Sequence, residues 1–152
     1  MEHALVVLED TPASKALVRE AGSYATAEDA TLSILVLVTE DEVERSVSTL
    51  ETIGQVENTS YGTETALKGA LAFVDEVAAE AFDGLDVEYE RLCEVVETSD
   101  RAEVTLDVAR EHGCDHIFTT GRKRSPTGKA LFGDFVQSLV LSFDGRVTVD
   151  LQ

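Results

Sequence analysis

The sequence lacks the features that mark membrane-spanning and secreted proteins. No apolar run approaches the roughly 20 residues that a helix needs to cross a bilayer. The first residues, Met1 to Ala4, carry no basic segment of the kind that opens a secretory signal. We therefore expect a cytoplasmic protein that does not enter a membrane.

Cysteine is also scarce. The two cysteines, Cys93 and Cys114, have neither CxxC spacing nor a metal-ligand pattern, and both stand in apolar, strand-like surroundings. Disulfides are rare in cytosolic proteins, and a free cysteine is among the most often buried residue types. We expect two buried free thiols and no metal site.

Positive charge is the most marked shortage. Twelve Lys and Arg stand against thirty Asp and Glu, for a formal net charge of -18. The acidic residues are spread along the whole sequence, which excludes a disordered acidic tail. Halophiles use high net charge to stay soluble in brine, so we expect a salt-adapted source, a halophilic archaeon. The same charge argues against binding to nucleic acid or to an anionic membrane, because affinity for a phosphate backbone comes largely from Lys and Arg.

What the sequence does contain is an alternation of strand-like and helix-like patterns in a length that suits one domain, residues 1–152. The expected strands cover residues 3–8, 31–38, 87–95, 115–120 and 147–151. Expected helices cover residues 13–27 and 60–82, a span from Ser99 or Asp100 to Gly113, and a last helix marked by Phe135, Leu139 and Val140. The first helix places Ala16, Leu17, Ala21 and Tyr24 on its apolar face. Residues 39–59 lack a clear period, and we expect a mobile insertion with at most one amphipathic turn at Val43, Val47 and Leu50.

Buried strands separated by helices predict an α/β fold, a parallel sheet covered by helices on both faces. In such sheets a ligand lies outside the carboxyl ends of the strands, where the strand order reverses. Three loops are therefore candidates for a binding site, at residues 9–11, 39–41 and 120–121.

The third of these loops opens a basic, glycine-punctuated segment that runs to Asp134. Arg122, Lys123, Arg124 and Lys129 form a positive island there, which can hold an anion or a protein partner. Gly121 after a strand allows positive φ and close approach of a phosphate, and Gly133 opens a helix whose free amides favour an anion. The alternative is a simple glycine turn with Asp134 as an ordinary N-cap. The two interpretations stay open at this point.

Several known phosphate and catalytic patterns are absent. Gly128-Lys129 is followed by Ala130 in place of Ser or Thr and has Lys123 where a P-loop needs glycine. Gly-x-Gly-x-x-Gly is missing after the first strand, which argues against a dinucleotide-binding dehydrogenase. The aspartate and lysine that a receiver domain requires are missing too. The three histidines and the serines form no catalytic set, so we expect no enzyme beyond slow, incidental ATP hydrolysis.

Three segments resemble the universal stress protein family, of the UspA type: residues 8–14 its first loop, 107–117 its helix before the fourth strand, and 121–134 its diagnostic loop. The resemblance covers nearly the whole chain. It implies a five-stranded parallel α/β fold of the Rossmann-like, adenine nucleotide alpha hydrolase-like type, with the last strand pairing in a homodimer.

In nucleotide-binding members of that family the diagnostic loop reads Gly-x2-Gly-x9-Gly-Ser/Thr and holds ATP. Gly121 and Gly133 match its first and third glycines, whereas Arg124 replaces the second and Asp134 replaces the Ser or Thr. By the same resemblance, Asp10 and Val38 would lie beside the adenine. The predicted contacts of ATP or another adenine nucleotide are Asp10, Val38, Gly121, Arg122, Arg124, Gly133 and Asp134.

The main functional hypothesis is a cytoplasmic stress-response regulator that acts as a homodimer through residues 146–151. An edge strand with Val147, Val149 and Leu151 on one face needs cover, which a second copy supplies; the alternative is an edge that stays short and charged. A second hypothesis is an interaction module without nucleotide, whose basic loop docks an acidic partner or a phosphate. A third is an ATPase switch with magnesium-dependent turnover.

Overall fold

The computed structural model describes residues 1–45, 59–122 and 133–152. Its centre is a sheet of five strands, all parallel, in the order β3-β2-β1-β4-β5. The strands are β1 (His3–Val7), β2 (Thr31–Thr39), β3 (Tyr89–Val96), β4 (His116–Gly121) and β5 (Arg146–Leu151). The predicted α/β fold with a five-stranded parallel sheet is confirmed.

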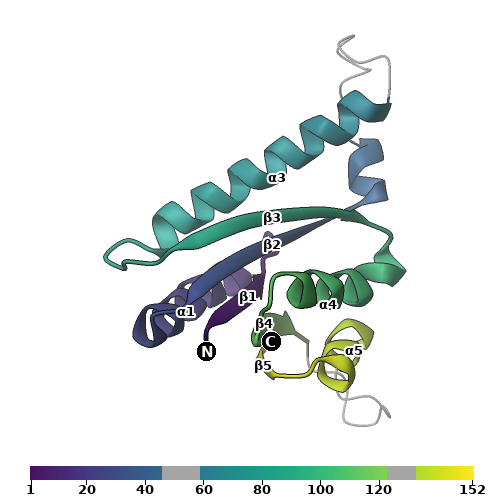
Figure 1. Ribbon diagram of the computed structural model, residues 1–152. Helices are drawn as coiled ribbons and strands as arrows, with labels where there is room; N and C mark the ends of the chain where they lie inside the picture. The colour runs from purple at the N-terminus through teal and green to yellow at the C-terminus, as the bar shows by residue number, and fades with distance from the viewer. Residues whose placement is uncertain (46–58, 123–132) are drawn as a thin grey trace.

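Helices cover both faces of this sheet. They are α1 (Pro12–Glu28), α3 (Thr59–Ala81), α4 (Arg101–Glu111) and α5 (Asp134–Ser142), with a 3-10 turn at Thr98–Asp100 before α4. α3 lies on one side of the sheet, and α4 and α5 lie together on the other (Figure 1). α1 packs against α3, so each face is covered by a pair of helices.

The alternation of side chains along β1 explains the two cores. Ala4 and Val6 point into the core beneath α1 and α3, whereas Leu5 points into the core beneath α4 and α5. All three are fully buried. Burying a side chain such as Leu5 contributes about 1.5–3 kcal/mol, so the apolar runs of the sequence select this layered arrangement.

The predicted apolar face of the first helix is partly wrong. Leu17 and Ala21 are buried as expected, but Tyr24 is 51% exposed. Ser14 and Gly22 take buried positions of α1 instead. A pattern that counts only apolar residues misses both, and the true buried face is rotated from the expected one.

The segment after β2 also departs from the expectation. Residues 40–45 are helical, and Val43 is buried with 5% exposure. The start of the predicted insertion is therefore packed. Val47 and Leu50 lie outside the described residues.

None of the helices in the described ranges combines the length and the apolar character that a membrane span requires.

Candidate functional site

The strand order reverses at β1, which has β2 on one side and β4 on the other. At the carboxyl ends of these strands lie two hollows. One, of about 710 Å³, lies between the loops that follow β1 and β2 and the helix α3. The other, of about 750 Å³, lies between the loops that follow β1 and β4 and the start of α5. Glu9, Thr11 and Arg101 line both, so the two hollows meet at the loop after β1.

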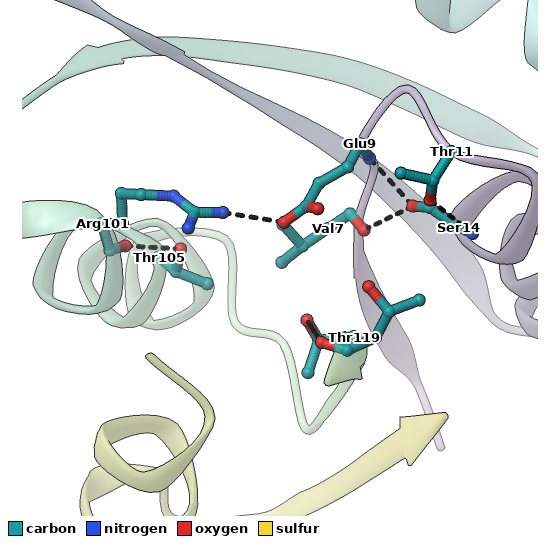
Figure 2. Close-up of polar contacts among 8 residues, drawn as sticks. Val7, Glu9, Thr11, Ser14, Arg101, Thr105 and Thr119 are labelled. Carbon is teal, nitrogen blue, oxygen red and sulfur yellow. Dashed lines mark hydrogen bonds and ion pairs between the residues drawn. The ribbon is translucent and has the colours of Figure 1, made fainter. Parts of the chain in front are cut away.

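A buried hydroxyl holds the loop after β1 in place. Ser14 Oγ accepts a hydrogen bond from the Glu9 backbone N–H at 2.8 Å and donates a longer one, of 3.4 Å, to the Val7 carbonyl (Figure 2). Thr11 is the N-cap of α1, and its Oγ1 accepts from the Ser14 N–H at 3.2 Å. Pro12 follows in the first turn, where its missing N–H costs nothing. The backbone position of Glu9 is therefore fixed by side chains of α1.

The Glu9 side chain points across the crevice toward α4 (Figure 2). Arg101 begins that helix, and its Nη2 donates to Glu9 Oε1 at 2.8 Å. The guanidinium carbon also lies 4.7 Å from the centre of the Phe135 ring of α5. The two side chains are 27% and 43% exposed, Arg101 being the less exposed. The ion pair thus joins the loop after β1 to the start of α4 at the meeting point of the two hollows.

The predicted base contacts lie in the first hollow. Val38 lines it and is 5% exposed. Asp10 lines it too, and its carboxylate lies 3.2 Å from Lys15 Nζ on the surface. The two residues that the sequence predicts beside the adenine, Asp10 and Val38, therefore line the same hollow. Their contact with an adenine stays a prediction.

Gly121, Arg122 and Gly133 line the second hollow. The expected positive φ at Gly121 is wrong, because the glycines with positive φ in the described chain are Gly84, Gly113 and Gly145. Space favours glycine at position 121: an added Cβ would lie 3.0 Å from Val149 Cγ1 and 3.1 Å from Val136 Cγ2, so these side chains would have to shift by a few tenths of an ångström.

Gly133, with φ -66 and ψ 162, is itself the N-cap of α5. The interpretation with Asp134 as N-cap is therefore wrong, since Asp134 already has helical geometry and no side chain caps this helix. Asp134 lines a third, smaller hollow of about 400 Å³ together with Thr98, Arg101 and Ser138. It stands beside the second hollow and does not line it.

Of the four cations of the basic island, Arg122 belongs to the described residues. Arg122 is exposed at the mouth of the second hollow. Lys123, Arg124 and Lys129 lie outside the described residues.

The opposite, amino end of the sheet carries a polar cluster that the sequence did not indicate. His3 Nε2 lies 2.6 Å from Ser33 Oγ, which donates to Glu90 Oε1 at 2.5 Å. His112 Nδ1 lies 3.0 Å from the same carboxylate oxygen. Ser33 is completely buried. We call these four residues the amino-end cluster. Within the described ranges, no group of three or more His, Cys, Asp or Glu side chains is arranged to hold a metal ion.

Both cysteines are free thiols, as expected. Burial raises the pKa of the Cys114 thiol to about 12 and that of Cys93 to about 11, and nearby carboxylates add to both shifts. Cys114 is buried, whereas Cys93 is only half-buried. Neither thiol is activated.

Sequence reasoning missed Arg101. A signal was present, since an arginine directly after the expected helix start at Ser99 or Asp100 must lie at the carboxyl end of the sheet. Its partner Glu9 is 92 residues away, however, and only the order of the strands brings the two together.

Comparison with solved structures agrees with the fold. The hypothetical protein MJ0577 superposes with a TM-score of 0.71 at 12% identity, over 99% of this chain and 96% of its own. A universal stress protein in complex with cAMP gives 0.62 at 15% identity, over 97% and 94% of the two chains. The universal stress protein from Archaeoglobus fulgidus in complex with dAMP gives 0.60 at 13% identity, over 98% and 96%.

No curated protein sequence matched the chain. The family model of the universal stress proteins, in contrast, matches residues 1–149, nearly the whole sequence. Fold, strand order and family model agree: the chain belongs to the universal stress protein family.

Proposed function

We propose that this protein is a stress-response regulator that binds an adenine nucleotide across the two hollows at the carboxyl end of the sheet. The single observation that carries the proposal is that the hollows meet at the loop after β1, where the strand order reverses. Ligands of open α/β sheets bind at such a point. The structural relatives with cAMP and dAMP support adenine nucleotides as the ligand class.

The base would occupy the first hollow, beside Asp10 and Val38. The phosphate would occupy the second, near Gly121, Arg122 and Gly133, where the free amides at the start of α5 favour negative charge. Arg124 and Asp134 are the remaining proposed contacts on the phosphate side. Asp134 would approach from the third hollow, and its carboxylate would oppose the phosphate charge. ATP, with more charge than a monophosphate, would depend most on Arg122 and Arg124.

The nucleotide would serve as a signal and not as a substrate. Among the described residues that line the two hollows there is no His or Cys to act as a nucleophile or general base, and both thiols elsewhere have raised pKa values. We expect at most slow, incidental hydrolysis of ATP, in a cytoplasmic protein.

Strand β5 would pair with its own copy in a homodimer. It borders the sheet, and Leu151 at its end is 37% exposed. Edge strands with exposed apolar side chains are ready to pair with another chain. Sedimentation at several protein concentrations tests this, and a monomer at all of them would contradict it.

The ligand is tested by purifying the protein in concentrated KCl, denaturing it, and measuring released nucleotide by mass spectrometry. We expect AMP, cAMP or ATP in near-stoichiometric amount. Calorimetric titration of the emptied protein with each nucleotide then ranks them. If no nucleotide is released and none binds, the alternative gains: an interaction module whose exposed Arg122 and basic loop dock an acidic partner or a phosphate.

The net charge of -18 supports a halophilic source. Repulsion between carboxylates weakens as salt screens them, with a Debye length of about 3 Å at 1 M. Helical circular dichroism and the thermal midpoint should therefore rise with KCl concentration. A loss of helical signal on adding KCl would contradict salt adaptation.

A further inference from the structure

We propose that Arg101 binds the phosphate of the nucleotide and that Glu9 competes with this phosphate for the guanidinium, so that the Glu9–Arg101 pair sets which ligands the crevice accepts. The inference rests on the proposed function. It assigns a specificity-determining role to two residues that the loop pattern of the sequence does not include.

The position of the pair is the first reason. Arg101 and Glu9 line both hollows, and Arg101 also lines the third. A ligand that reaches from the first hollow into the second must pass both side chains. No other cation among the described residues lines both hollows, since Arg122 lines only the second.

The geometry of Arg101 is the second reason. Phe135 covers one face of the guanidinium at 4.7 Å and orients it, while Nη2 donates to Glu9 Oε1 at 2.8 Å. A guanidinium has five N–H donors in a planar fork that matches a phosphate as well as a carboxylate. The side chain is 27% exposed, which leaves it open to the hollows while shielding it from bulk water.

The Glu9 carboxylate therefore occupies the position at Arg101 that a phosphate would take. Its backbone is fixed by Ser14, so its carboxylate stays near Arg101 when no ligand is bound. A phosphate entering the second hollow meets this negative charge and must displace it. Asp10 does not compete in the same way, because its carboxylate is matched by Lys15 at 3.2 Å.

The affinity of a nucleotide that carries a phosphate should thus depend on both residues, whereas the affinity of adenosine should depend on neither. The experiment is a calorimetric titration of AMP and of adenosine into the wild type, Glu9→Gln and Arg101→Gln, each in the same KCl buffer. Glu9→Gln should bind AMP about tenfold more tightly and Arg101→Gln about tenfold more weakly, the size of one hydrogen bond to a charged group. Adenosine should bind all three proteins equally.

The matched control is Asp41→Asn. Asp41 is an exposed carboxylate in the helical turn that follows β2, at the same end of the sheet, and it lines neither hollow. The Asp41→Asn substitution removes one negative charge, as Glu9→Gln does, but does not free Arg101, so AMP affinity should change little. The double variant Glu9→Gln, Arg101→Gln should bind AMP nearly like Arg101→Gln alone, because the guanidinium for which Glu9 and the phosphate compete is then absent.

The outcomes separate cleanly. Equal gains from Glu9→Gln and Asp41→Asn would reduce the effect to the general field and overturn the inference. Equal losses of AMP and adenosine in Arg101→Gln would mean a structural role and overturn it too. If the wild type binds adenosine and AMP but neither variant changes AMP affinity, this inference alone fails. If no protein binds either ligand, the proposed function fails with it. Should Arg101→Gln not fold by circular dichroism, Glu9→Gln and Asp41→Asn decide.

Discussion

The two ends of the sheet carry similar chemistry in opposite circumstances. At the amino end, His3, Ser33, Glu90 and His112 bond to one another, and the hydroxyl at their centre is completely buried. At the carboxyl end, Glu9 and Arg101 also bond to each other, but open hollows adjoin them on both sides. Both are clusters of polar and charged side chains on the same sheet.

The two clusters differ in how much of their hydrogen-bonding capacity is left for a ligand. In the amino-end cluster, Ser33 donates to Glu90 and lies against His3, so its hydrogen-bonding capacity is used within the fold. In the Glu9–Arg101 pair, the guanidinium has five N–H donors, of which Nη2 donates to Glu9, and Phe135 covers one of its faces, while the hollows leave room beside it for a ligand. A polar cluster is therefore a candidate binding site only where its groups have hydrogen-bonding capacity left and a hollow beside them can hold a ligand. The former cluster should serve stability, and the latter should serve binding.

The largest effect is expected from Ser33→Ala. It removes a fully buried hydroxyl that donates to the Glu90 carboxylate and bonds His3, while His112 stays bonded to Glu90. The loss of a hydrogen bond to a charged group should lower the free energy of unfolding by about 1–3 kcal/mol. Urea unfolding measures this, with Ser23→Ala on the exposed face of α1 as the control. AMP affinity should not change. A loss of affinity without a loss of stability would reverse the roles we assign to the two ends.

Ser14→Ala should affect both properties, because Ser14 is a buried residue that builds the carboxyl-end site. The Glu9 N–H loses its acceptor, and the free energy of unfolding should fall by about 1 kcal/mol. The loop that positions Glu9 and Asp10 should loosen, and AMP should bind more weakly. Urea unfolding and calorimetry on one preparation test the two effects together. Unchanged AMP affinity in a destabilised variant would show that the loop is held by other contacts.

A smaller effect concerns pH and the third histidine at the amino end, His116. Burial lowers the pKa of the His116 imidazole below its ordinary value of 6.5, and the Arg146 cation adds to this. The unfolded chain therefore takes up a proton near pH 6.5 that the folded chain resists. Stability from this residue is complete above that pH and is lost as pH falls below it. Urea unfolding from pH 7.5 to 5.5 should show a shallower decline for His116→Asn; equal declines would contradict the prediction.

The smallest effect is expected from Asp134→Ser. Because Asp134 lines its own hollow beside the second one, removing its charge should raise AMP affinity by less than about threefold, within the range of exposed charges. Glu9→Gln in the same titration is the reference. A tenfold gain from Asp134→Ser would place this carboxylate against the phosphate and would move the competition from Glu9 to Asp134.

The fold could be predicted because its signals are local. The largely apolar segments at residues 3–8 and 31–38 predict buried parallel strands, and they form β1 and β2. The face of α1 was misjudged because a polar Ser14 is buried there for its hydrogen bonds. Composition alone cannot distinguish such a serine from an exposed one.

The site could be predicted only in part, because it is assembled from distant segments. The loops after β1, β2 and β4 were identified from the general rule for parallel sheets. The pairing of Glu9 with Arg101 depends on β1 lying between β2 and β4, which no local pattern reports. The reason predicted for a glycine at position 121 is wrong: a glycine at a strand end suggests backbone freedom, whereas the structure shows close packing against Val136 and Val149.

The backbone N–H of Gln152 donates to the Gly121 carbonyl at 2.9 Å, and Gln152 lines the second hollow. A polyhistidine tag fused after this residue would therefore emerge at the mouth of the crevice, where its imidazoles could occupy the place of a ligand. Fusion at Met1 avoids this, since that residue lies at the other end of the parallel strands. There it would remove an ion pair of 3.6 Å with the exposed Glu28 and the attraction between the terminal ammonium and the Asp115 carboxylate. Binding measurements on this protein are best made with the tag at that end or cleaved.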